Sequence, residues 1–192
     1  MAVEVVIDGT NFGGKTPLVG RLLERLGAAG RSAAAASPYR EVEVYELWDD
    51  APEEAAARIL ERMEEHRRRA TEDVLVWDRG WPTCFVSTRS AAARRRFLPL
   101  PGLSYLLLNT SAATEKKVRK YGLSPGVYPW MHGRRLRDEI PYEELARLFA
   151  DDLRVFRPTL EDDRFDLELV AGEIEAEISE ELARRRRCQT SV

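Results

Sequence analysis

Residues 9–16 combine glycines, a lysine and a threonine at the spacing of a phosphate-binding loop. The segment, Gly-Thr-Asn-Phe-Gly-Gly-Lys-Thr, matches the pattern G-x-x-x-x-G-K-[ST] in full. Glycines let successive backbone N–H groups point at phosphate oxygens, the lysine adds positive charge at the β- and γ-phosphates, and the threonine hydroxyl ligates Mg²⁺. The pattern therefore predicts a site for a nucleoside triphosphate with Mg²⁺. The predicted binding residues of this loop are Gly9, Asn11, Phe12, Gly13, Gly14, Lys15 and Thr16.

The segments on both sides of the loop are of the kinds that such a loop requires. An apolar run predicts a buried strand over residues 2–8, and leucines and a valine at helical spacing predict a helix over 16–28. Pro17 is compatible with this helix because a proline in the first turn costs little. The alternative, a glycine-rich turn that has a lysine beside it by coincidence, does not explain this strand–loop–helix order.

Strand and helix patterns alternate along the rest of the chain, which predicts a parallel sheet with helices on both faces. Further strands are predicted at 41–47, 73–78, 104–109 and 165–170, and further helices at 52–70, 112–120, 141–156 and 173–187. The alanine-rich segment 32–37 is interpreted as a link. The expected fold is α/β: a three-layer α/β/α P-loop NTPase fold with a five-stranded parallel sheet, in a single domain over 1–192.

Composition narrows the class of protein. Of the 192 residues, 44% are hydrophobic and 33% charged, which is typical of a globular domain. The net charge of −3 disfavours nucleic acid as a partner. Two cysteines form no metal or disulfide framework, no run approaches the length of a membrane span, and the start has no secretory pattern. The expected location is the cytoplasm, with no membrane association.

Polar residues follow the predicted strand 73–78, at the edge where ligands of parallel sheets bind. Asp78 is at the point where a carboxylate could hold Mg²⁺, although an aspartate there could also cap the next helix. Arg79 offers bidentate donors to a second anionic ligand. Trp81, two residues further on, is either a wall of an acceptor pocket or a core residue.

The segment 48–50 follows another predicted strand and leaves two interpretations open. Trp48 could stack on a nucleobase, and Asp49 could bind a sugar hydroxyl or accept a proton. Alternatively, Trp48 belongs to the core and Asp50 caps the helix that follows.

The segment 121–138 is rich in glycine, proline and arginine and is expected to be a loop. Its arginines could neutralise the charge that develops on a transferred phosphoryl group, and the same run could instead be an exposed basic loop. The candidates are Arg134, Arg135 and Arg137, with Arg119 in the preceding helix as a further candidate.

The assembled pattern resembles the nucleotide and nucleoside kinases of the thymidylate kinase type. Residues 6–16 are similar to that family's opening strand and loop, with Asp8 as the acidic residue before the first glycine. Residues 77–79 are similar to its Asp-Arg motif, and residues 133–138 to its lid. The resemblance implies transfer of the γ-phosphate of ATP to a nucleoside monophosphate or nucleoside with Mg²⁺, an acceptor phosphate bound by Arg79, and dimers, which are common in the family.

The sequence departs from this family pattern in three places, all in the part that would bind the acceptor. Asn11 stands where the family commonly has a carboxylate for the acceptor sugar, and no arginine is evident after the predicted second strand. Residues 46–48, Glu-Leu-Trp, are similar to an acidic-plus-tryptophan arrangement of deoxynucleoside kinases. A kinase for another small molecule, such as an antibiotic or a biosynthetic intermediate, and a non-catalytic nucleotide-binding module therefore remain alternatives.

Overall fold

The structure is a computed structural model that describes residues 2–10, 13–42, 51–88, 102–110, 142–159 and 164–189, together with five single residues: Arg94, Ala113, Lys116, Arg119 and Lys120. In this part of the chain, five strands form one parallel sheet in the order β2-β3-β1-β4-β5. The strands are β1 (Val3–Gly9), β2 (Ala33–Ala36), β3 (Val74–Asp78), β4 (Leu103–Leu107) and β5 (Leu153–Phe156). The predicted five-stranded parallel sheet is confirmed.

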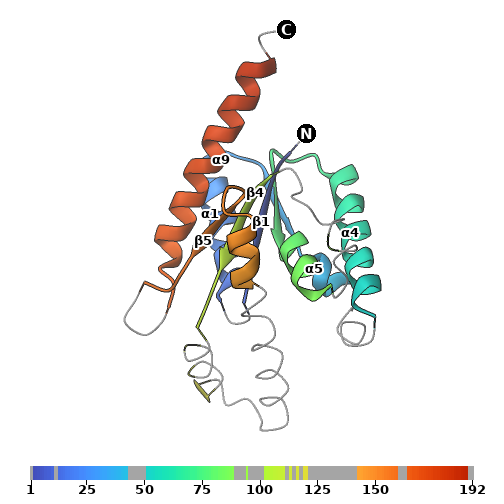
Figure 1. Ribbon diagram of the computed structural model, residues 1–192. Coiled ribbons are helices and arrows are strands. Elements are labelled where there is room, and N and C mark those ends of the chain that lie inside the picture. The colour runs from blue at the N-terminus through green and yellow to red at the C-terminus, as the bar shows by residue number, and fades with distance from the viewer. Residues whose placement is uncertain are drawn as a thin grey trace.

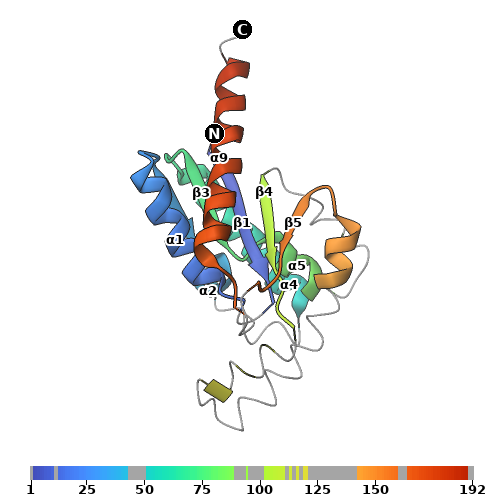
Figure 2. The ribbon, with the colours of Figure 1, turned by 90° about the vertical axis from the view of Figure 1, so that its left-hand side faces the viewer.

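Helices cover both faces of this sheet (Figure 1, Figure 2). On one face α1 (Lys15–Ala28) packs beside α9 (Leu167–Gln189). The other face carries α4 (Pro52–Arg69), α5 (Trp81–Ser87) and the helical residues 142–148. A short helix, α2 (Pro38–Glu41), follows β2 and contacts α4. The predicted helices at 16–28 and 52–70 are confirmed within a residue, and the four described residues of 112–120 are helical.

The strand β1 shows why a continuous apolar run was needed at the start of the chain. Its side chains alternate between two cores, Val5 and Ile7 facing α1 and α9, and Val6 facing α4 and α5. Because both faces of a parallel sheet are covered by helices, a central strand is apolar at nearly every position. Val3, Val5, Val6 and Ile7 are accordingly all buried.

The prediction of a second strand at 41–47 was wrong at its start. Glu41 ends α2, and the strand is Ala33–Ala36, inside the segment interpreted as a link; residues 43–47 lie outside the described part. Alanine is a poor strand former, but β2 lies at the sheet edge and pairs in register with β3, Ala33 beside Val74 and Ala36 beside Trp77. Pairing with a neighbouring strand overrides intrinsic propensity here.

The prediction of a last strand at 165–170 was also wrong. The last strand of the described residues is β5, inside the segment 141–156 predicted to be one helix, and Leu167 begins the long helix α9. The side chain of Asp166 accepts a hydrogen bond from the backbone N–H of Leu169, which caps the start of this helix. Apolar residues then recur at helical spacing toward α1, at Val170, Ala171, Ile174, Ile178 and Leu182.

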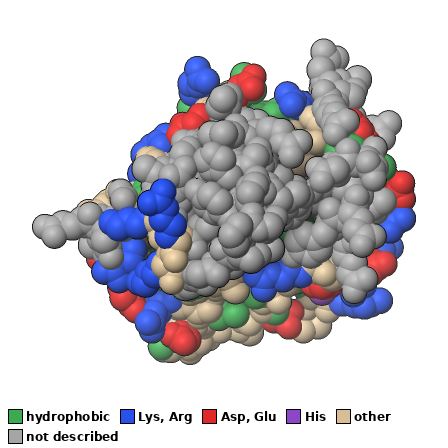
Figure 3. Space-filling view, turned by 90° about the horizontal axis from the view of Figure 1, so that it is seen from below, with side chains coloured by type: hydrophobic (Ala, Val, Ile, Leu, Met, Phe, Trp, Pro, Cys, Tyr) green, Lys and Arg blue, Asp and Glu red, His purple; other side chains and the backbone are tan. Residues whose placement is uncertain are grey.

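The carboxyl ends of the central strands form a crevice. The chain leaves β1 toward α1 on one face and leaves the adjacent β3 toward α5 on the opposite face. In open α/β sheets ligands bind at such points, where neighbouring connections diverge. Figure 3 views this edge of the molecule and shows Lys and Arg side chains at several places on it.

Candidate active site

The predicted phosphate-binding loop passes so close to β4 that its first glycine cannot carry a side chain. The backbone φ angle of Gly9 is 124°, and a Cβ on Gly9 would lie 2.2 Å from the carbonyl oxygen of Leu107. The next N–H, of Thr10, donates a hydrogen bond to that same carbonyl over 3.1 Å. Gly14, with φ 81°, precedes the first residue of α1. The predicted strand–loop–helix order is therefore present, with the positive end of the α1 dipole at the loop.

Lys15 turns back over this loop. Its side chain is buried, and Nζ donates hydrogen bonds to the carbonyl oxygens of Gly9, over 3.0 Å, and Thr10, over 2.6 Å. A buried ammonium group needs hydrogen-bond acceptors, and the backbone carbonyls of the loop supply them. The positive charge predicted from the sequence is thus held at the loop by the loop's own backbone.

Thr16 and Asp78 are brought together although they belong to different elements. The hydroxyl of Thr16, in the first turn of α1, donates a hydrogen bond to Oδ2 of Asp78, at the end of β3, over 2.6 Å. Asp78 is buried and Thr16 is exposed. A hydroxyl and a carboxylate are oxygen donors of the kind that Mg²⁺ prefers. Both residues that the sequence indicated for a metal are therefore neighbours.

Arg40 joins this pair, and sequence analysis did not identify it. Its Nη2 donates a hydrogen bond to the hydroxyl of Thr16 over 2.8 Å and lies 3.7 Å from Oδ2 of Asp78. It follows β2 by four residues, so an arginine does stand after the second strand. The error had one cause: placing the second strand at 41–47 put Arg40 before the strand instead of after it.

Asp8 is the other residue that the site predictions omitted. Its side chain has no solvent exposure, and its carboxylate accepts hydrogen bonds from the backbone N–H groups of Gly9, Gly80 and Thr83 at 2.7, 2.9 and 2.9 Å. The hydroxyls of Thr83 and Tyr142 donate two more, at 2.7 and 2.8 Å. An acidic residue at the end of an apolar strand is the sequence signal that could have identified Asp8, because a buried carboxylate needs hydrogen-bond donors around it.

Arg79 holds an unusual backbone conformation, with φ 74°. Its guanidinium, 17% exposed, lies 3.8 Å from Oδ1 of Asp8 and stacks over the ring of Tyr39 at 5.1 Å. Nη1 donates long hydrogen bonds to the carbonyl of Gly9 at 3.5 Å and the hydroxyl of Thr83 at 3.3 Å. Burial acts to lower the pKa of Arg79, but interactions with its neighbours, including Asp8, outweigh it and raise that pKa. The guanidinium is therefore charged and held beside the loop.

A cavity of about 420 Å³ opens next to these groups. Loop residues 13–16 line it together with Arg40, Asp78 and Arg79. Arg164, Phe165 and Leu167, at the start of α9, also line it. Because the sequence analysis placed Phe165 and Leu167 in a strand at 165–170, it did not bring this segment to the site.

The remaining predicted site residues divide into two groups. Trp81 is fully buried in the core, where its Nε1 donates a hydrogen bond to the hydroxyl of Ser104 over 3.0 Å. Arg119 is helical and exposed to solvent. Neither lines the cavity beside the loop. Asn11, Phe12, Trp48, Asp49, Arg134, Arg135, Arg137 and the predicted lid, 121–138, lie outside the described residues.

None of the helices in the described ranges is long and apolar enough to cross a membrane. In comparisons with known proteins, no protein-family model matches the chain. No curated protein matches it either.

Proposed function

We propose that this chain is an ATP-dependent kinase that transfers the γ-phosphate to a nucleoside monophosphate or a nucleoside. The observation that supports this most is the arrangement at the carboxyl edge of the sheet. There the phosphate-binding loop, with buried Lys15, lies beside the contact between Thr16 and Asp78. The resemblance of residues 6–16 and 77–79 to kinases of the thymidylate kinase type points to the same reaction.

The donor half of the site fits ATP and Mg²⁺. The donor set is a hydroxyl and a carboxylate 2.6 Å apart. It lies next to a glycine-rich loop whose Gly13 and Gly14 line the cavity, and loops of this kind bind phosphate oxygens through their backbone N–H groups. Thr16 and Asp78 would hold the cation, which when bound supplies positive charge to the phosphates. Lys15 and the loop N–H groups bind the donor phosphates and orient the γ-phosphate toward the cavity.

The acceptor half is formed by two arginines. Arg79 is fixed beside the carbonyl of Gly9 by its neighbours, and Arg40 reaches Thr16 from α2. A guanidinium presents planar donors that match a phosphate, so these side chains bind the phosphate of a nucleoside monophosphate acceptor and align it with the γ-phosphate. Positioning two anions in this way accounts for a large part of phosphoryl-transfer catalysis.

The test is transfer of labelled phosphate from ATP to a panel of nucleosides, nucleoside monophosphates and small alcohols. We expect transfer to at least one nucleoside or nucleotide, and its loss in Lys15→Met with the fold retained. Lys116→Met is the matched control, because Lys116 is exposed on a helix and does not line the cavity.

Each other result contradicts the proposal in a distinct way. Transfer to small alcohols alone would favour a kinase for another metabolite. Tight ATP binding without transfer to any acceptor would favour a nucleotide-binding module. Full activity in Lys15→Met would reject the role of the loop.

A further inference from the structure

The carboxylate of Asp8 joins three segments that are distant in the sequence. It lies at the end of β1, immediately before the phosphate-binding loop, and accepts hydrogen bonds from the turn after β3 and from Tyr142 at the start of the helical residues 142–148. It also accepts the N–H of Gly9, the first residue of the loop itself. One buried charge thus contacts the loop that would bind the donor and the turn that carries Arg79.

The number of donors on Asp8 explains how a fully buried charge is accommodated. Two backbone N–H groups, of Gly80 and Thr83, belong to the start of α5, where such groups have no partner within the helix. The hydroxyls of Thr83 and Tyr142 complete the shell and contact each other at 2.9 Å. Such networks are rigid when every member is satisfied.

The turn that Asp8 holds contains the strained residue. A non-glycine residue at φ 74° persists only where the surroundings determine the backbone on both sides. The N–H of Arg79 donates a hydrogen bond to the carbonyl of Ile7 over 3.0 Å, and the N–H of the next residue, Gly80, donates to Asp8 over 2.9 Å. The backbone of Arg79 is therefore fixed from β1 at two successive N–H groups.

The same network also reaches the side chain of Arg79. The guanidinium donates to the hydroxyl of Thr83, which itself donates to Asp8, and lies 3.8 Å from Oδ1 of that carboxylate. Backbone and side chain of Arg79 are thus both set by groups bound to Asp8.

We propose that Asp8, acting through Thr83 and Tyr142, is the positioning residue that holds Arg79 in place to bind the acceptor. This rests on the proposed kinase function, in which Arg79 binds the anionic part of the acceptor. The hydroxyls of Thr83 and Tyr142 both bond to Asp8. The hydroxyl of Thr16 bonds instead to Asp78, and Nζ of Lys15 bonds to backbone carbonyls of the loop. Removing the hydroxyl of Thr83 or Tyr142 leaves the hydrogen bond from the N–H of Gly9 to Asp8 in place, so we expect acceptor binding to be weakened more than ATP binding.

Two matched pairs of variants test this in the full chain. Thr83→Val removes the hydroxyl and keeps the shape, whereas Thr83→Ser keeps the hydroxyl. Tyr142→Phe removes the hydroxyl that reaches Asp8. Tyr105→Phe is its control, because Tyr105 is equally buried but donates its hydrogen bond to Glu177, which lies outside this network.

The readout is the KM for each substrate, with the acceptor that the wild-type chain phosphorylates. We expect Thr83→Val and Tyr142→Phe to raise the KM of the acceptor by about tenfold, the scale of one lost hydrogen bond to a charged group, and to leave the KM of ATP within about twofold. Thr83→Ser should restore the acceptor KM. Urea unfolding of all four variants separates loss of stability from loss of positioning.

The two proposals fail in distinguishable ways. If the wild-type chain transfers phosphate but the acceptor KM of Thr83→Val and Tyr142→Phe equals that of their controls, the positioning role is wrong and the kinase function stands. Equal rises in both KM values would show that the network supports the whole site and not Arg79 in particular, which also rejects the positioning role. If the wild-type chain transfers phosphate to no acceptor, the kinase function fails, and the positioning role fails with it.

Discussion

The hydroxyl of Thr16 donates a hydrogen bond to the carboxylate of Asp78 over 2.6 Å, across 62 positions of the sequence. Thr16 lies in the first turn of α1 and Asp78 ends β3, so their contact depends on the pairing of β1 with β3, in which Ile7 lies beside Asp78. A change at either residue is therefore expected to alter the same property, the proposed binding of Mg²⁺.

We expect Thr16→Val and Asp78→Asn each to raise the Mg²⁺ concentration needed for half-maximal phosphate transfer by about tenfold or more, since each removes an oxygen ligand or its charge. Titration of activity with Mg²⁺, together with Mn²⁺ binding followed by electron paramagnetic resonance, measures the effect. Thr71→Val, at an exposed position, is the control. An unchanged Mg²⁺ requirement in both site variants would show that these residues hold no cation.

Arg40→Gln tests an arginine that contributes to the site and little to stability. Its side chain is 59% exposed, and exposed ion pairs are worth at most about 1 kcal/mol. We expect kcat/KM to fall by about tenfold while the urea midpoint stays unchanged. Arg58→Gln is matched to it, since Arg58 is 50% exposed and paired with Glu54 on α4. Equal activity of the two variants would remove Arg40 from the site.

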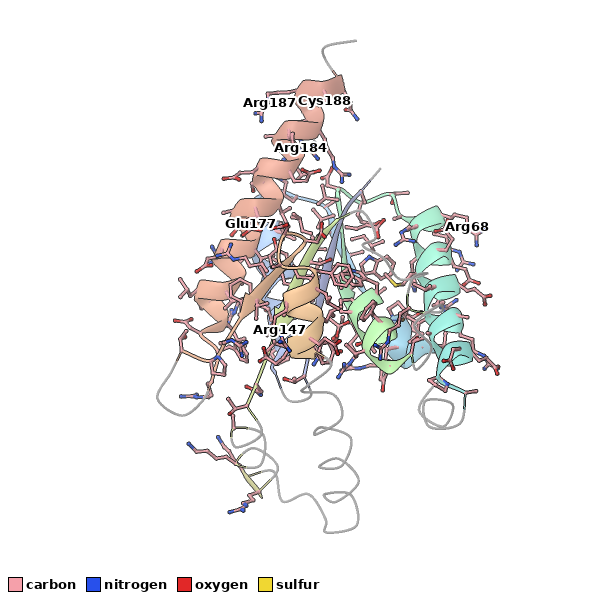
Figure 4. The ribbon with its side chains drawn as sticks, in the orientation of Figure 1. Arg68, Arg147, Glu177, Arg184, Arg187 and Cys188 are labelled. Atoms are coloured by element: carbon pink, nitrogen blue, oxygen red, sulfur yellow. The ribbon has the colours of Figure 1, made fainter. Side chains whose placement is uncertain are left out.

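The two cysteines should react at very different rates. Burial, with a further contribution from the charge of Asp8, raises the pKa of Cys84 well above its usual value, whereas Cys188 is exposed in the last turn of α9 (Figure 4). Because the thiolate is the reactive form, a disulfide reagent at pH 8 should modify one thiol per native chain and the second only in denaturant. Cys188→Ser should abolish the fast reaction. Two fast thiols in the native protein would contradict the buried environment of Cys84.

The C-terminal part of α9 should contribute a pH-dependent stability. Hydrogen bonds from Arg184 and Arg185 lower the pKa of Glu181 from its ordinary value of 4.5 to about 2. A folded-state pKa below the unfolded one stabilises the fold above pH 4.5, and this contribution is lost as the pH falls toward 2. Glu181→Gln should therefore be less stable than the wild type at pH 7, by a difference that shrinks on acidification. Urea titrations at several pH values measure it, and a difference that is constant with pH would be contrary to this assignment.

Elements fixed by local pattern were predictable from the sequence, and elements fixed by pairing were not. The loop at 9–16 and α1 carry their own signals, since glycine spacing and helical periodicity are local. The strand β2 carries none, because four alanines become a strand only when β3 is beside them. The start of α9 failed for another reason: six residues with alternating polarity do not separate a strand from a helix.

The same distinction holds for the residues of the candidate site: those marked by a local pattern were predictable, and those positioned by distant segments were not. Lys15, Thr16 and Asp78 could be named because a motif and a strand end identify them. Arg40 was not found because its role depends on where β2 lies. Asp8 was noted only as part of a resemblance, since its partners come from α5 and the helical residues 142–148, and no local pattern in the sequence joins those segments.

The left-handed backbone conformation of Arg79 lowers the stability of the fold, although the proposed function needs an arginine at this position. Glycine would adopt φ 74° without strain, whereas arginine there carries a cost on the order of 1–3 kcal/mol. Selection of random variants for thermal stability alone is therefore expected to accept glycine at this position. Selection for growth that depends on the proposed phosphate transfer is expected to keep the arginine.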